Sequence, residues 1–400
     1  MQSALLFRPR PHADELFSSW LVRLAWANTQ KLHSFTRKVL PRRLHWLRDL
    51  DSSCSGEDIA DICEASLLPY EKIFVTTLRQ YETRVFETLN VTGPTRWLMP
   101  VGKRGRNRLL HGQQYCRHCL LDGESYFKRR WRLAFSVVCA EHEVVLRDAC
   151  GDCGATIAFH HYDFGRNSIP QECPITICWA CRTDLRTATK VPDYPASPDA
   201  VALQRALDVC LDQGWSDQLP GARAYGLLFF EGLHKIARLA SSPGRGARLR
   251  RHFQQQDGVL SLNFGFPNRR NRVEDLRVGD RLIVMSIVRR LIEGWPSSFI
   301  EACRASRVTS WYIADVGRLP HWLDAPVRLH LGDRFYAPTA TERAAVKKYL
   351  LEAGESASEN QIRRWLGVRF NSRHPSDPFL RPAGHWNSRR SGDRDSLDEG

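Results

Sequence analysis

The fold of this chain depends most on residues 116–181, where four short segments read CRHC at 116–119, CAEH at 139–142, CGDC at 150–153 and CWAC at 178–181. Each segment places two soft metal ligands two residues apart, the spacing that lets one tight turn present both to a tetrahedral Zn²⁺. The sequence therefore predicts two structural zinc ions. The predicted ligands are Cys116, Cys119, Cys139 and His142 at the first site and Cys150, Cys153, Cys178 and Cys181 at the second.

Chance does not explain these spacings. Twelve cysteines placed at random in 400 residues would give roughly 0.4 C-x2-C pairs, and the sequence has three. A set of four protein ligands favours a structural site, because a catalytic zinc usually leaves its fourth position to water. Disulfide bonds are disfavoured, because nothing resembles a secretory signal and the paired cysteines are too close to crosslink usefully.

Two alternatives remain open at this point. Cys173 could replace Cys178 as a ligand, at the expense of a longer loop to Cys181. The segments could also pair alternately in a cross-brace, although the short interval between His142 and Cys150 favours sequential sites. Three other histidines of this region are expected to lie outside both sites, namely His118, His160 and His161.

Length and composition restrict the class of protein. A chain of 400 residues with 42% apolar residues predicts two or three globular domains. No apolar run reaches the 18 residues of a membrane span, so a soluble, cytoplasmic protein is expected. Its 58 Lys and Arg residues against 44 Asp and Glu residues give a net charge of +14, which favours nucleic acid as a partner and nucleoid association when bound. A merely solvated basic surface is the alternative.

The opening segment has apolar residues at helical spacing from Leu16 to Ala25, with Asp14 as the expected N-cap and an end near Asn28. Two further helices, at 58–65 and 70–89, are separated by Leu68-Pro69 and predict a helix-turn-helix-like arrangement. DNA reading and simple bundle packing both remain open for this pair.

The second half of the chain is also expected to be helical. The predicted helices are 197–214, 225–240, 274–293, 341–352 and 358–366. The fold class is therefore mainly α with small zinc-stabilised β and loop modules. The predicted organisation is an N-terminal helical domain at 1–94, tandem zinc fingers at 95–192, a helical domain at 193–386 that binds DNA or a partner, and a disordered tail at 387–400.

Several basic groups are candidates for contact with nucleic acid, because arginine and lysine neutralise phosphates and an interleaved aromatic such as Trp131 can stack on bases. The alternative is that Trp131 packs in the core while its basic neighbours face water. The candidate residues are Lys128, Arg129, Arg130, Arg248, Arg250, Arg251, Arg269, Arg270, Arg363 and Arg364.

No catalytic motif is found in the sequence. The phosphate-binding pattern G-x-x-x-x-G-K-[ST] is missing, and the segment that follows His142 lacks the second histidine of H-E-x-x-H. The zinc-deaminase pattern is missing too. An enzyme is therefore not expected.

Two stretches resemble the TniQ proteins of transposons. One is Tyr115-Cys116-x2-Cys119, Tyr126, Trp131, Cys139-x2-His142, Leu146 and Cys150-x2-Cys153-Gly154, and the other is the opening segment from Phe7-Arg8-Pro9-Arg10-Pro11 to Ala25. The resemblance covers residues 5–185, and the second half is only loosely similar.

This resemblance, of the TnsD or TniQ kind, implies a non-catalytic adaptor that selects the target site in DNA recombination by transposition. Such proteins recognise target DNA directly or through an RNA-guided Cascade complex of a CRISPR-associated transposon. They then recruit a TnsC-type AAA+ ATPase, and some are homodimers. A stand-alone, zinc-stabilised, sequence-specific DNA-binding regulator is the alternative function, and a zinc-dependent enzyme is a more distant one.

Overall fold

The protein is seen here as a computed structural model that describes residues 4–41, 46, 49–101, 103–104, 108–163, 173–219, 222–257, 272–313, 319–331, 335–336, 339–366 and 381–382. It divides into two compact units, which are Met1–Arg307 with Arg318–Asp324 (unit 1) and Val308–Gly317 with Ala325–Gly400 (unit 2). Helices dominate the described residues, as the sequence predicts. Among those residues, no helix is both long enough and apolar enough to cross a membrane.

Short helices open unit 1. They are α1 (Phe17–Ala27), α2 (Leu32–Val39), α3 (Leu50–Ser53), α4 (Gly56–Ser66) and α5 (Tyr70–Phe74), followed by the 3₁₀ turn η2 (Leu78–Tyr81). The predicted apolar stripe of α1 is confirmed, since Trp20, Leu21 and Leu24 are buried. The predicted N-cap is wrong: Leu16 caps α1, and Asp14 has a left-handed backbone and forms ion pairs elsewhere.

The second predicted helix pair is only partly confirmed. Helices α4 and α5 lie where the sequence predicts them, but α5 ends at Phe74 instead of near Leu89. The hydroxyl groups of Thr76 and Thr77 donate hydrogen bonds back to the carbonyls of Ile73 and Phe74, at 2.6 and 2.8 Å. Such local bonds compete with continuation of a helix. A DNA-reading role for this pair stays a prediction.

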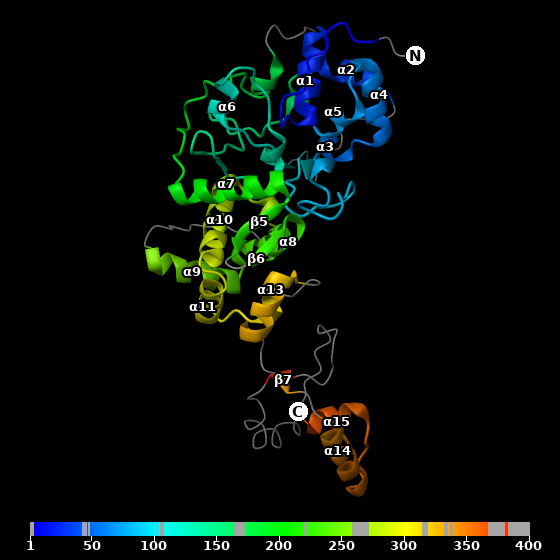
Figure 1. Ribbon diagram of the computed structural model, residues 1–400, viewed down its shortest axis with the longest axis vertical. Helices are drawn as coiled ribbons and strands as arrows, with labels where there is room; N and C mark the ends of the chain where they lie inside the picture. The colour runs from blue at the N-terminus through cyan, green and yellow to red at the C-terminus, as the bar shows by residue number, and fades with distance from the viewer. Residues whose placement is uncertain are drawn as a thin grey trace, which may run out of the picture. The chain divides into compact units, whose positions relative to one another are not determined.

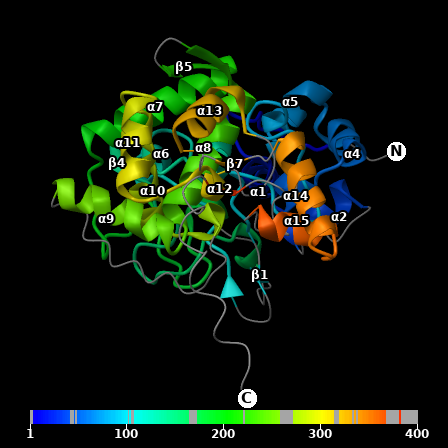
Figure 2. The ribbon, with the colours of Figure 1, turned by 90° about the horizontal axis from the view of Figure 1, so that it is seen from below.

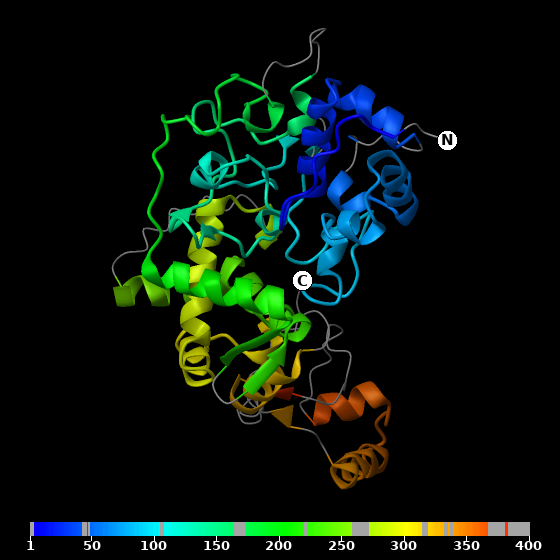
Figure 3. The ribbon, with the colours of Figure 1, turned by 45° about the horizontal axis from the view of Figure 1, so that its top comes forward.

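A loop-rich segment follows and packs against α1 (Figure 3). Its elements are β1 (Lys103–Arg104), β2 (Arg108–Leu109), α6 (Arg117–Leu121), η3 (Arg129–Arg132), β3 (Val138–Cys139), β4 (Val144–Val145), η4 (Phe159–His161) and η5 (Pro174–Thr176). Strands β3 and β4 form an antiparallel hairpin. The Leu16 amide donates to the Phe127 carbonyl at 2.9 Å, and the Phe127 amide donates to Ser19 Oγ at 3.0 Å.

The remainder of unit 1 is helical. Its elements are α7 (Pro198–Gln213), β5 (Trp215–Leu219), β6 (Ala222–Tyr225), α8 (Gly226–Ser241), α9 (Arg245–Asp257), η6 (Val273–Asp275), α10 (Val278–Ile292) and α11 (Ser297–Ala305), and α13 (His321–Pro326) begins there. Helix α10 packs against α7, α8 and α11 (Figure 1). Figure 2 shows α7, α10 and α11 on one side of unit 1 and α2, α4 and α5 on the other. The helices predicted at 197–214 and 225–240 are confirmed.

Buried polar groups join these parts of unit 1. The Trp97 amide donates to Glu274 Oε1, and its indole N–H donates to the Phe230 carbonyl, both at 2.7 Å. Arg281 of α10 is fully buried and donates to Gln114 Oε1 at 2.9 Å. The predicted domain boundaries near residues 94 and 192 therefore both lie inside one compact unit.

Unit 2 contains a small helical hairpin. Helices α14 (Ala340–Glu352) and α15 (Glu359–Trp365) pack around Leu350, Ile362 and Leu366. Its other elements are α12 (Ser310–Ile313), the π-helical turn η7 (Val327–Leu331), β7 (Phe335–Tyr336) and β8 (Arg381–Pro382). The tail predicted at 387–400 lies outside the described residues.

Candidate metal centres

Three of the four ligand segments fold into the same tight turn. The amide that follows the second ligand donates to the carbonyl of the first: Glu143 to Cys139 at 2.8 Å, Gly154 to Cys150 at 3.0 Å and Arg182 to Cys178 at 3.0 Å. All three donors have left-handed φ angles, of 53°, 72° and 67°. In the first segment the Leu120 amide also donates to the Cys116 carbonyl, at 3.2 Å, but there Cys116 caps the short helix α6, which carries Cys119. The spacing of two residues between ligands thus specifies a local turn, and this turn orients both ligands toward the same side.

The first four predicted ligands converge, and we call this cluster site 1. It consists of Cys116, Cys119, Cys139 and His142. His142 Nδ1 lies 3.8, 3.4 and 3.5 Å from the sulfur atoms of Cys116, Cys119 and Cys139, and Cys119 Sγ lies 3.5 Å from Cys139 Sγ. Metal–ligand bonds of about 2.0–2.3 Å in a tetrahedron give edges of roughly 3.3–3.8 Å. These separations therefore fit one four-coordinate ion.

The other nitrogen of His142 is held by a carboxylate. Its Nε2 lies 2.8 Å from Asp122 Oδ2, which fixes the ring with Nδ1 toward the sulfur atoms. Metal-binding histidines commonly have such a partner. Glu141 adds a second outer contact, with Oε2 at 3.3 Å from Cys119 Sγ. Asp122 and Glu141 were missed at the sequence level, because no spacing rule connects them to the ligands.

The other four predicted ligands converge as site 2, which consists of Cys150, Cys153, Cys178 and Cys181. The sulfur atoms of Cys150 and Cys181 lie 3.6 Å apart, as do those of Cys153 and Cys178. Burial raises the pKa of the Cys178 thiol to about 12, although the amides of Cys181 and Ala180 oppose this shift. A bound cation would supply the positive charge that favours the thiolate at neutral pH.

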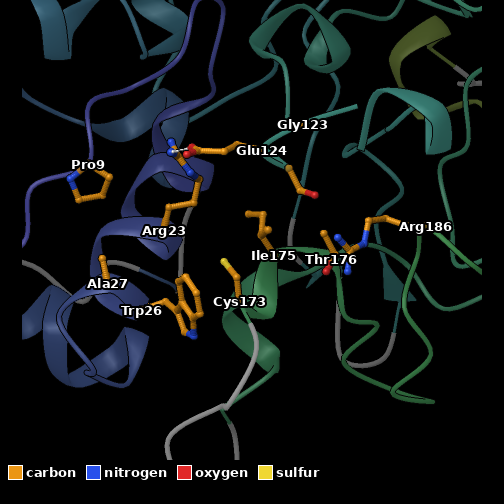
Figure 4. A pocket seen from close by; sticks show the side chains of 11 residues that line it. Pro9, Arg23, Trp26, Ala27, Gly123, Glu124, Cys173, Ile175, Thr176 and Arg186 are labelled. Carbon is orange, nitrogen blue, oxygen red and sulfur yellow. Dashed lines mark hydrogen bonds and ion pairs between the residues drawn. The ribbon is translucent and has the colours of Figure 1, made fainter. Parts of the chain in front are cut away.

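Both open alternatives are resolved by this geometry. The ligands group in sequential pairs, so the cross-brace arrangement is wrong for the described residues. Cys173 belongs to neither cluster; it lines a cavity of about 480 Å³ beside α1. Figure 4 shows its sulfur near Ile175, with Arg23 paired to Glu124 and Trp26 on the side of α1. Within the described residues, neither cluster includes His118, His160 or His161.

Lys128, directly before η3, and Arg129 and Arg130 within it all have acidic partners. Lys128 pairs with Glu141 at 2.7 Å, and Arg129 and Arg130 pair with Asp14 at 3.2 and 2.6 Å. Arg130 also reaches two acidic residues of the α7 region, Asp208 and Asp212, at 3.4 and 3.5 Å. Both arginines thus connect η3 to the segment before α1, and Arg130 also connects it to α7. Contact of the three basic residues with nucleic acid stays a prediction.

The three arginines of α9 differ in placement. Arg250 is buried and donates to the carbonyls of Ala240 and Ser242 at the end of α8, whereas Arg248 and Arg251 are exposed. The remaining candidates cannot be placed in this way. Arg269 and Arg270 lie outside the described residues, and of Arg363 and Arg364 only the backbone, in α15, is described.

Comparison with known protein families identifies the family of one part of the chain. Residues 6–146 match the family model TniQ, whose domain is associated with transposition. The match includes α1 and all ligands of site 1 but ends before Cys150, so it is shorter than the resemblance over residues 5–185. No curated protein matches the chain. Residues 6–146 of this chain therefore form a domain of the TniQ family.

Proposed function

We propose that this protein is a non-catalytic adaptor that selects the target site in DNA transposition. In this role it links target DNA, or an RNA-guided Cascade complex, to a TnsC-type AAA+ ATPase and its transposase. The TniQ match over residues 6–146 carries the proposal. The net charge of +14 supports work close to a polyanion.

The proposal includes one structural zinc ion in each site. The donors are sulfur atoms and one imidazole nitrogen, the set that a borderline-soft ion such as Zn²⁺ prefers. Each site offers four protein ligands, so an ion held there has no open position for substrate or water. Both ions would then act by fixing the surface of a loop-rich segment.

A retention assay tests the adaptor role. Purified protein is passed over three immobilised baits: a target duplex, a Cascade complex with guide RNA, and the TnsC-type ATPase. We expect retention on the ATPase and on one of the two targeting baits, with sedimentation of the free protein reporting whether it is a homodimer. Failure to bind the ATPase would overturn the adaptor role.

The same assay distinguishes the adaptor role from the alternative function. Nanomolar, sequence-selective binding to the duplex, with no retention on the ATPase or Cascade, would identify a stand-alone DNA-binding regulator instead. A weak and steeply salt-dependent interaction with the duplex would indicate phosphate contact alone.

A further inference from the structure

Positive charge is concentrated on one segment of the chain. From Gly232 to Gln256 the sequence has six Lys and Arg residues and no Asp or Glu. The second half of this stretch is helix α9. Arg130 in η3, by comparison, pairs with the carboxylates of Asp14 and Asp208 inside unit 1. A run of one sign is expected to attract a polyanion where its side chains face water.

Helix α9 has two distinct faces. Leu249 and Phe253 are buried, and Arg250 donates to carbonyls at the C-terminal end of α8. Gly246 allows this close approach, since a Cβ at that position would clash with the Leu239 carbonyl. These contacts fix the rotation of α9 about its own axis. The opposite face is therefore presented in a defined orientation.

That outer face carries Arg248, Arg251 and Gln255, which are exposed and spaced three and four residues apart. Within the described part of the chain, neither Arg248 nor Arg251 has a side-chain hydrogen bond or ion pair. Guanidinium groups bind phosphate through paired N–H donors, and glutamine amides donate to phosphate oxygens as well.

We infer that the outer face of α9, defined by Arg248, Arg251 and Gln255, binds the phosphate backbone of duplex DNA. The face contains no large exposed apolar side chain. Protein partners are usually anchored by such side chains, whereas phosphate contacts need only positive and polar groups. This inference deepens the proposed function, on whose contact with target DNA it rests.

The test compares two double variants of the full chain, each of which loses two positive charges. R248A/R251A removes the outer arginines of α9, and alanine preserves the helix. R205A/R223A removes two exposed arginines elsewhere, which pair with Glu143 and Asp217. Binding to a random-sequence duplex is measured across a salt series, with double-stranded RNA and poly-glutamate as competitors.

We expect R248A/R251A to weaken duplex binding about tenfold or more at 0.1 M salt and to lower the slope of log K against log salt by about 1.8. R205A/R223A should bind as the unaltered protein does. Equal losses in both variants would overturn the inference, as would competition by poly-glutamate or RNA that exceeds competition by duplex DNA.

Retention on the ATPase separates this inference from the adaptor role. If R248A/R251A binds the ATPase normally but has lost duplex affinity, both proposals are supported. If the duplex result holds while the unaltered protein fails to bind the ATPase, the α9 surface stands and the adaptor role falls.

Discussion

Site 1 and site 2 have the same number of ligands but different surroundings. In site 1, the three cysteines are buried and pack in the same core as α1. In site 2, Cys150 and Cys178 belong to that core, while Cys153 and Cys181 are exposed. Site 1 also lies inside the TniQ match, and site 2 lies beyond it. Site 1 is therefore part of the core, whereas site 2 lies at the edge of that core.

The largest effect is expected from Cys139→Ser in site 1. A structural zinc ion contributes roughly 10–16 kcal/mol of apparent folding free energy, as much as the whole stability of a typical domain. Losing the ion would also leave polar sulfur groups buried in the core. We expect unfolding of the loop-rich segment together with loss of ATPase binding, measured by thermal melting, elemental analysis and retention. Normal melting with site 1 empty would contradict this role.

A smaller effect is expected from Cys181→Ser in site 2. The Cys181 and Cys153 side chains face water, so solvent can hydrate the groups that a departing ion leaves behind. We expect one ion to remain per chain and the melting temperature to fall less than in Cys139→Ser. If the two variants melt alike, the proposed difference between the sites is wrong.

A third effect concerns metal affinity without loss of the fold. Asp122→Asn weakens the acceptor that orients His142, and removal of such an outer partner typically lowers metal affinity 10–100-fold. Competition with a chelator measures the change at site 1. Asp152→Asn is the matched control, because Asp152 flanks a ligand of site 2 and accepts only a bond from the Lys190 amide among its described contacts. Equal weakening by both variants would rule out the His142 explanation.

The smallest effects on stability are expected from substitutions at residues that directly follow a second ligand and have a left-handed backbone conformation. Gly154→Ala should cost about 1 kcal/mol, since the position has φ +72° and no neighbouring atom that an added methyl group would meet. Glu143→Gly should be neutral or slightly stabilising, because relief of similar strain offsets the loss of an exposed ion pair with Arg205. Denaturant unfolding with metal bound measures both. Similar destabilisation by the two changes would show that φ is not the cause.

The ligands of both sites could be predicted because their information is local. Two residues between ligands suffice to specify a turn, and the structure adds only the hydrogen bond from the following amide to the first carbonyl. Long helices such as α7 were predictable for the same reason, with Ser197 as N-cap and Gly214 at the end. The end of α5 was not, because it depends on two threonine hydroxyls that compete for backbone carbonyls.

Contacts between distant residues could not be predicted from one sequence. Nothing in the spacing connects His142 with Asp122, or Arg130 with Asp14 and Asp208. The sequence therefore left open whether the basic run around Trp131 contacts nucleic acid, and the structure adds that acidic residues of α7 and of the segment before α1 lie against Arg130. A run of basic residues in a sequence identifies a nucleic-acid-binding surface only when the acidic residues that lie beside it in the folded protein are known.

The buried hydrogen bonds of Trp97 and Arg281 affect how this protein can be shortened. Cleavage after residue 192 would leave the Trp97 indole and amide without their acceptors on Phe230 and Glu274, and would remove the guanidinium that satisfies Gln114. We therefore expect a fragment that ends at residue 192 to be less stable than the same segment in the full chain. The later helices thus share one core with the residues that match the family.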